Sequence, residues 1–167
     1  MSKAKSAVPQ GFHTVTPQLI LDNANEALDW YQRALGAEEV RPRSLGPDGK
    51  VMHAEIRVGN SIIMLNDAMG GGRSAKAIGG SPIGLWVYVE DCDALYHRAV
   101  AAGAQVPSGP MGALMDQFWG DRSGTIVDPF GYTWTIATRK EELEPAEIKQ
   151  RMDAFMAQFA REQATAR

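Results

Sequence analysis

The feature that most constrains the fold is an internal repeat. The pairs Ala27-Leu28 and Gly36-Ala37 recur as Ala94-Leu95 and Gly103-Ala104, at a constant shift of 67 residues. The strand pattern that precedes each pair fits a shift of 68, so one copy has an extra residue before its helix. Each copy follows the order strand, helix and three strands. The repeat therefore predicts two tandem βαβββ modules.

The first module is predicted at residues 11–66, after a flexible N-terminal arm at residues 1–10. Its helix is expected to begin at Asp22 or Asn23, because both have capping side chains, and to end at Gly36. Its strands are expected at residues 13–21, 38–44, 51–58 and 61–66.

The strand at residues 51–58 alternates between apolar and polar side chains, which is typical of a sheet with one buried face. The apolar face is predicted to cover the helix and consists of Met52, Ala54, Ile56 and Val58. The opposite face carries His53, Glu55 and Arg57.

The second module is predicted at residues 83–140, after a Gly-rich linker at residues 67–82 that shows no periodicity. Its helix is expected to begin at Asp91 or Asp93 and to end at Gly103. Its strands are expected near residues 104–107 and at 83–89, 114–127 and 132–138. The last two are joined by a tight Asp-Pro-Phe-Gly turn, in which glycine accepts a positive φ.

Residues 141–167 are predicted to form a C-terminal helix. Its apolar stripe consists of Ile148, Met152, Phe155, Met156 and Phe159. We expect this stripe to pack over its own module or onto a partner subunit.

Composition excludes several classes of function. The chain has 167 residues, a net charge of −3 and scattered basic residues, which gives no footprint for nucleic acid. No apolar run approaches the length of a membrane span, and residues 1–12 do not resemble a signal peptide. The single cysteine, Cys92, excludes an internal disulfide and favours a cytoplasmic location.

Three motifs carry a family resemblance: LDWYQRALGAE in the first helix, HAEIRVGNSIIMLND in the first module, and FWGDRSGTIVDPFGYTWTIAT at residues 118–138. With them the sequence resembles the vicinal oxygen chelate superfamily (glyoxalase/bleomycin resistance protein/dioxygenase), and within it the PhnB-like branch. The resemblance implies an α+β fold in which two βαβββ modules form a curved mixed-sheet cup, commonly in a homodimer.

In metal-dependent members of this family, each module supplies two ligands, one from its first strand and one from its last. The matching positions here are Thr16, Ile63, Gly84 and Thr135. None of these is a usual protein ligand for a divalent metal. We therefore expect no cofactor at the family position, while a divalent metal at a non-standard site stays open.

Strand alternation gives candidate residues for the inside of the cup. The ligand-binding candidates are Gln18, Trp86, Tyr88, Trp119, Arg122, Thr133 and Thr135. The aromatic residues among them suit stacking on a planar ligand, and their alternative role is packing in the core or in a dimer.

Two polar pairs also have alternative roles. His53 and Glu55 are candidates for a general base and its partner, or for an ordinary ion-paired strand face. Asp121 and Arg122 could clamp an anionic group or form internal salt bridges that fix the turn.

The leading functional hypothesis is a metal-free, cytoplasmic homodimer that binds a small organic ligand in its cup. The alternative is a metal-dependent lyase, isomerase or dioxygenase of the same superfamily with a non-standard site. A third possibility is a protein-interaction module that uses the C-terminal stripe.

Overall fold

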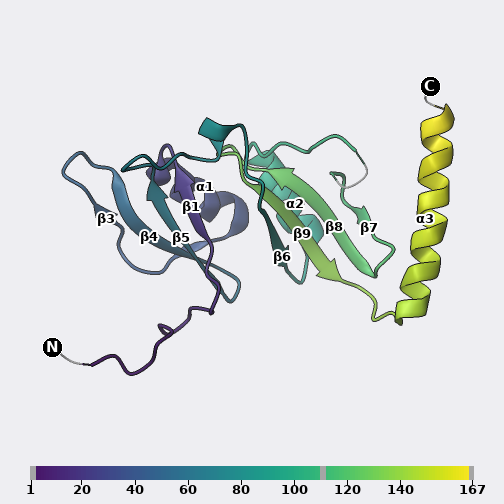
Figure 1. Cartoon of the computed structure of the whole chain (residues 1–167), viewed down its shortest axis with the longest axis horizontal. Coiled ribbons are helices and arrows are strands. Elements are labelled where there is room, and N and C mark those ends of the chain that lie inside the picture. The colour runs from purple at the N-terminus through teal and green to yellow at the C-terminus, as the bar shows by residue number, and fades with distance from the viewer. Residues whose placement is uncertain (1–2, 110–111, 166–167) are drawn as a thin grey trace.

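Two curved sheets, each covered by a helix, form the body of the molecule, and a third helix extends from it (Figure 1). The computed structural model describes residues 3–109 and 112–165, with residues 162, 163 and 165 described by backbone alone. Residues 1–2 of the predicted arm and 166–167 of the predicted C-terminal helix lie outside the described residues. The predicted α+β fold class is confirmed.

The first sheet has the strand order β1-β5-β4-β2, and β3 also pairs with β4. The edge strand β1 runs parallel to its neighbour β5, whereas the other pairs are antiparallel. The elements are β1 (Gln18–Leu21), α1 (Ala24–Leu35), β2 (Glu38–Glu39), β3 (Ser44–Leu45), β4 (Val51–Val58) and β5 (Ser61–Asp67).

The second sheet repeats this topology with the order β6-β9-β8-β7, and β6 runs parallel to β9. Its elements are β6 (Gly84–Tyr88), α2 (Cys92–Ala101), β7 (Met115–Asp116), β8 (Asp121–Val127) and β9 (Thr133–Arg139). A short 3₁₀ helix, η1 (Lys76–Ile78), precedes this sheet, and α3 (Pro145–Thr165) follows it.

The capping residues set the ends of α1 and α2. Asn23 Oδ1 accepts a hydrogen bond from the Glu26 amide at 3.2 Å, and Asp91 Oδ1 accepts one from the Ala94 amide at 2.9 Å. Both bonds satisfy an amide that has no partner within the helix. Gly36 ends α1 with a left-handed φ of 68°, a conformation that glycine adopts without steric cost.

Prolines and glycines shorten several predicted strands. The strand predicted at 13–21 begins only after Pro17, and the one predicted at 38–44 is divided around Pro42 into β2 and β3. Proline lacks an N–H group for the ladder, which explains both interruptions. Gly120, with a φ of 94°, divides the strand predicted at 114–127 into β7 and β8. The strand predicted near 104–107 is a single bridge between Gln105 and Val127.

The alternation predicted for β4 is wrong at the first two residues of the strand. Ala54, Ile56 and Val58 are buried as predicted, but Met52 is exposed and Val51 is fully buried instead. A register shift between Ser44 and Leu45 on the neighbouring β3 changes the pairing there. Such an irregularity shifts the inward-facing position by one residue.

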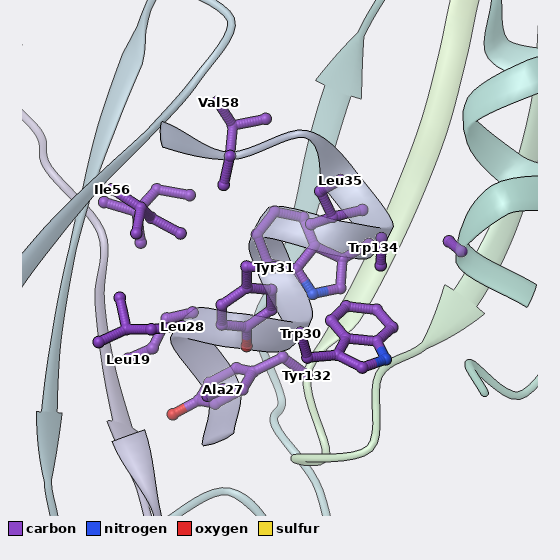
Figure 2. Packing of buried hydrophobic residues seen from close by; sticks show 14 of the residues in the cluster. Leu19, Ala27, Leu28, Trp30, Tyr31, Leu35, Ile56, Val58, Tyr132 and Trp134 are labelled. Carbon is purple, nitrogen blue, oxygen red and sulfur yellow. The ribbon is translucent and has the colours of Figure 1, made fainter. Parts of the chain in front are cut away.

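Aromatic side chains from both modules meet in one continuous core (Figure 2). Tyr31 of α1 lies 5.5 Å from Trp30 and 5.6 Å from Trp134 of β9, measured between ring centroids. The Trp30 indole N–H also donates to the carbonyl oxygen of Ala102, beyond the end of α2, at 2.8 Å. Burial of rings this large is a main contribution to stability.

A buried carboxylate, Asp128, connects the modules at the Asp-Pro-Phe-Gly turn. Its Oδ2 accepts hydrogen bonds from the Tyr31 hydroxyl and the Trp134 indole, both at 2.8 Å. Its Oδ1 accepts the backbone amides of Phe130 and Tyr132, both at 2.9 Å. Burial raises the pKa of Asp128, while these four donors act in the opposite direction.

A second connection joins this turn to β1 and to the linker. The Tyr132 hydroxyl accepts the Ile20 amide and donates to the Ile20 carbonyl, at 2.8 and 2.9 Å. Gly131 lies against the linker, where an added Cβ would be 3.1 Å from the Lys76 backbone nitrogen. The segment predicted as a loose linker thus contains η1 and packs against the turn.

Helix α3 projects away from the second module (Figure 1). Phe155 packs against Phe118 with ring centroids 5.7 Å apart, and Arg151 pairs with Glu141 and Glu147. The stripe residues Met152 and Met156 are exposed. No described helix combines the length and apolarity needed to cross a membrane.

Replacing Asp128 with alanine should strongly destabilise the protein. The change leaves the Tyr31 hydroxyl and Trp134 indole without an acceptor, so we expect the free energy of unfolding to fall by about 3 kcal/mol or more. Urea unfolding measures the change. The control, Asp91→Ala, removes only a helix cap and should cost about 1 kcal/mol. Equal losses in the two variants would contradict the role of Asp128.

Truncation after Leu143 should leave a folded protein. Helix α3 contributes the Phe118–Phe155 contact and exposed ion pairs, so its removal should cost no more than about 2 kcal/mol. Urea unfolding and far-UV circular dichroism of the truncated chain test this expectation. Failure of the truncated chain to fold would make α3 part of the core.

Candidate functional site

The second sheet presents four predicted site residues on its face opposite α2, here called the open face: Trp86, Tyr88, Thr133 and Thr135. Leu85 and Val87 of β6 pack against the core, so the alternate residues Trp86 and Tyr88 point outward. Thr135 pairs with Trp86 in register, and Thr133 pairs with Gly84. Strand alternation thus brings these candidates onto one surface.

Three aromatic side chains adjoin one another on this face. Trp86 lies 6.3 Å from Tyr88 and 6.3 Å from Trp119, measured between ring centroids. Trp86 and Tyr88 remain 47% and 58% exposed. Their packing is therefore incomplete, and their rings are available to a further molecule.

Asp121 holds two of these aromatic side chains in place. Its side chain is fully buried, and Oδ2 accepts hydrogen bonds from the Tyr88 hydroxyl at 2.8 Å and the Trp119 indole at 2.9 Å. Arg139 pairs with Oδ1 at 3.2 Å. Burial, followed by the hydrogen bond to Asp121, raises the pKa of Tyr88.

The role of Asp121 was not predicted, although the sequence contains a signal for it. The tight turn sets the register of the β8–β9 hairpin, in which Val127 pairs with Thr133 and Asp121 with Arg139. Continuing the pairing from the turn would have placed these opposite charges side by side.

The aromatic surface borders a cleft of about 590 Å³ between the modules, here called the aromatic cleft. Trp86 and Tyr88 contribute to one wall, and Ile62 of the β4–β5 hairpin contributes to the other. The remaining lining comes from His13, Val15, Pro17, Val58–Ser61, Ile63, Leu85, Val87 and Trp134. Trp119, Thr133 and Thr135 extend the open face beyond this cleft. The volume is in the range of small-molecule sites.

The first module contributes a group of polar contacts. His53 Nε2 lies 2.9 Å from Glu55 Oε1, and Arg41 Nε lies 3.0 Å from Glu55 Oε2. Glu55 is buried, whereas His53 is partly exposed. The predicted pair is therefore in contact, with Arg41 as an additional partner. Gln18, the remaining candidate in this sheet, donates to Asn66 Oδ1 at 2.7 Å.

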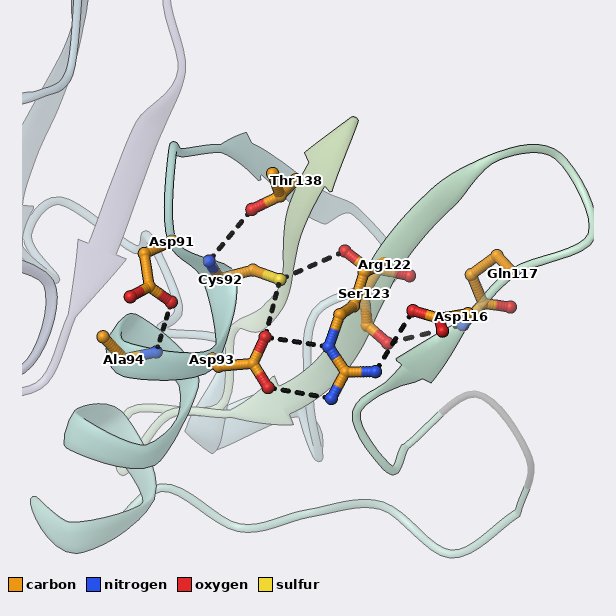
Figure 3. Close-up of polar contacts among 9 residues, drawn as sticks. All are labelled: Asp91, Cys92, Asp93, Ala94, Asp116, Gln117, Arg122, Ser123 and Thr138. Atoms are coloured by element: carbon orange, nitrogen blue, oxygen red, sulfur yellow. Dashed lines mark hydrogen bonds and ion pairs between the residues drawn. The ribbon is translucent and has the colours of Figure 1, made fainter. Parts of the chain in front are cut away.

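Arg122 points to the acidic side chains of Asp93 and Asp116 (Figure 3). It makes two hydrogen bonds of 2.8 Å to Asp93 on α2 and one of 3.1 Å to Asp116. These contacts raise the pKa of Arg122 and lower that of Asp93. Consecutive strand residues point to opposite faces, which separates Arg122 from Asp121. Asp121 and Arg122 both form internal ion pairs, the second of the two predicted roles. Asp121 pairs with Arg139, and Arg122 pairs with Asp93 and Asp116.

The positions that match the family's metal ligands do not fit a divalent metal. Ile63 is buried in the core, and its neighbour Met64 instead pairs with Gln18 in register. Thr135 Oγ1 lies 3.1 Å from Thr125 Oγ1. Within residues 3–109 and 112–165, no group of three or more His, Cys, Asp or Glu side chains could hold a metal ion. The absence of a cofactor stays a prediction.

Comparisons with known proteins agree with this architecture. A Mycobacterium tuberculosis protein described as uncharacterized is 40% identical over 145 residues, covering 84% of this chain and 82% of that protein. The PhnB protein from Bacillus cereus matches with a TM-score of 0.59 and 19% identity, covering 75% of this chain and 99% of that one.

A bleomycin-binding protein, solved in complex with bleomycin, matches with a TM-score of 0.54 and 19% identity, covering 77% of this chain and 99% of that one. Both structural matches show a shared fold. The sequence profile of the Glyoxalase/Bleomycin resistance protein/Dioxygenase superfamily matches residues 11–136. The chain therefore belongs to the glyoxalase/bleomycin resistance protein/dioxygenase superfamily.

Proposed function

We propose that this protein binds a small, planar organic ligand in the aromatic cleft without a divalent metal at the family position. The observation that carries the proposal is the exposed Trp86–Tyr88 surface at the wall of a cleft of about 590 Å³. A ring that stacks on Trp86 removes apolar area from water, and aromatic contacts favour offset or edge-to-face geometry.

The support of Asp121 favours ligand binding over incidental exposure. A buried carboxylate is costly unless donors compensate it, and here Tyr88, Trp119 and Arg139 do so. This arrangement fixes exposed rings before a ligand arrives, which reduces the entropy lost on binding. A relative with the same fold holds the small molecule bleomycin.

The proposal includes the homodimer and the cytoplasmic location expected from the sequence. Cys92 is buried and has a free thiol, which is compatible with a reducing compartment. Exposed apolar residues of α3, such as Met152 and Met156, are candidates for contact with a second copy. Sedimentation velocity tests the dimer directly.

A second candidate function is enzymatic, with His53 and Glu55 acting together. The buried Glu55 carboxylate holds one imidazole nitrogen and leaves His53 partly exposed, an arrangement that suits proton transfer or a non-standard metal site. Metal analysis of the purified protein separates the two functions. A stoichiometric metal that disappears in His53→Ala would favour the enzyme and contradict metal-free binding.

Replacing Trp86 with alanine should weaken binding of an uncharged aromatic probe. The fluorescence of phenylnaphthylamine is expected to report saturable binding, and the dissociation constant should rise about fivefold to tenfold in Trp86→Ala because one stacking surface is lost. Ile78→Ala, which removes an exposed apolar side chain outside the cleft, should leave the affinity unchanged. Equal affinities in Trp86→Ala and the unaltered protein would contradict the proposed site.

Replacing Asp121 with asparagine should weaken probe binding indirectly. An amide retains one acceptor oxygen, so at least one of the donors Tyr88, Trp119 and Arg139 loses its partner. We expect the free energy of unfolding to fall by about 1–3 kcal/mol, together with weaker binding of phenylnaphthylamine. Asp116→Asn removes an exposed carboxylate and is the control for both measurements. Unchanged binding in a destabilised Asp121→Asn protein would limit Asp121 to a structural role.

A further inference from the structure

A second cleft lies directly beside the aromatic cleft and differs from it in chemistry. It has a volume of about 720 Å³ and is lined by Arg41, Arg57, Gly59, Asn60 and residues 9–11. We call it the arginine cleft. Gly59 and Asn60 also line the aromatic cleft, so the β4–β5 turn forms a wall common to both.

Arg57 lies on β4, and none of the described residues is a partner for its charge. Its side chain has no ion pair or hydrogen bond to any other residue of the described ranges 3–109 and 112–165. Glu38 lies opposite Arg57 in the β2–β4 register but forms no ion pair with it. A guanidinium group that lines a cleft with all its donors free is suited to bind an oxyanion.

Arg41 is positioned from behind by a buried carboxylate. Its Nε lies 3.0 Å from Glu55 Oε2, and the Glu55 side chain is 4% exposed while that of Arg41 is 59% exposed. This contact is an ion pair without hydrogen-bond geometry, since Glu55 Oε2 accepts no hydrogen bond from the described residues, and the two terminal nitrogens of the guanidinium are left for another acceptor. Glu55 thus restrains Arg41 and does not itself line the cleft.

The lining of the arginine cleft is unusual for this protein. The chain has 20 acidic and 17 basic residues, yet the described residues that line this cleft include two arginines and no acidic side chain. Asn60 adds an amide group to the same wall. The charged side chains of the lining are thus both basic, with the carboxylate of Glu55 behind Arg41, and a basic lining favours the binding of an anion.

We propose that the arginine cleft binds the anionic group of the ligand whose planar part occupies the aromatic cleft. The ligand class is then an aromatic compound with a carboxylate, sulfonate or phosphate group. This inference rests on the proposed ligand-binding function, because it joins the two clefts through Gly59 and Asn60. Charge-assisted hydrogen bonds from Arg41 and Arg57 supply the recognition.

A pair of probes that differ in one anionic group tests the inference. Anilinonaphthalene sulfonate has the ring system of phenylnaphthylamine and an added sulfonate. We expect the sulfonate to bind at least about fivefold more tightly, with an advantage that decreases as salt is added. Equal affinities of the two probes for the unaltered protein would contradict the inference.

Substitution of the arginines should separate the two probes further. Arg57→Gln, which breaks no internal contact, should weaken sulfonate binding about threefold to fivefold and leave the uncharged probe unaffected, and Arg41→Gln should act in the same direction. Glu38→Gln should strengthen sulfonate binding about twofold, because it removes a nearby negative charge. Arg33→Gln, an equal charge change on the exposed surface of α1, is the matched control.

The outcomes distinguish this inference from the proposed function. If Trp86→Ala weakens both probes but Arg57→Gln weakens neither selectively, the anion site is wrong and the aromatic cleft remains. If Trp86→Ala affects neither probe, the proposed function fails. If Arg33→Gln and Arg57→Gln weaken sulfonate binding equally, the loss reflects the net charge of the protein, and the anion site is wrong.

Discussion

The arrangement of the two modules depends on the Asp128 carboxylate and its four donors. Tyr31 comes from the first module, while Trp134 and the amides of Phe130 and Tyr132 come from the second. Such a buried carboxylate cannot lose one partner without a large cost, so the group fixes the modules together. The turn also bonds to Ile20 through the Tyr132 hydroxyl. The position of β6 beside the first module, and hence the aromatic cleft, follows from these contacts.

Buried carboxylates with more than one partner also occur elsewhere in the fold. Asp67 accepts the amides of Ala24 and Val51, both at 2.7 Å, and so fixes the start of α1 against β4. Asp121 orients Tyr88 and Trp119, and Glu55 restrains Arg41 and His53. Asp67 stabilises backbone geometry, whereas Asp121 and Glu55 hold side chains that remain partly exposed. All three carboxylates are buried, so the groups that each one binds decide whether it serves the fold or the site.

The sequence predicted the fold well because its signals are local and repeated. Helix caps, strand alternation and the repeat identify the two modules, and alternation alone places Trp86, Tyr88 and Thr135 on one face. The errors arise where a neighbouring segment decides the outcome. A register shift between β3 and β4 exposes Met52. Arg122 binds Asp93, a residue distant in sequence. Arg41 was missed because its link to Glu55 crosses the irregular segment between β2 and β3, where alternation gives no information.

The positions that match the family's metal ligands carry no charged side chain. At these positions the Thr135 hydroxyl lies within hydrogen-bond distance of the Thr125 hydroxyl. Next to Ile63, Met64 pairs with Gln18 in register. Charged and aromatic groups lie instead on either side of the Gly59-Asn60 turn, with Trp86 and Tyr88 in one cleft and Arg41 and Arg57 in the other. Gly59 adopts a φ of 59°, a left-handed conformation that glycine takes without steric cost. A ligand that uses both clefts must therefore span this turn, with its ring on one side and its anionic group on the other.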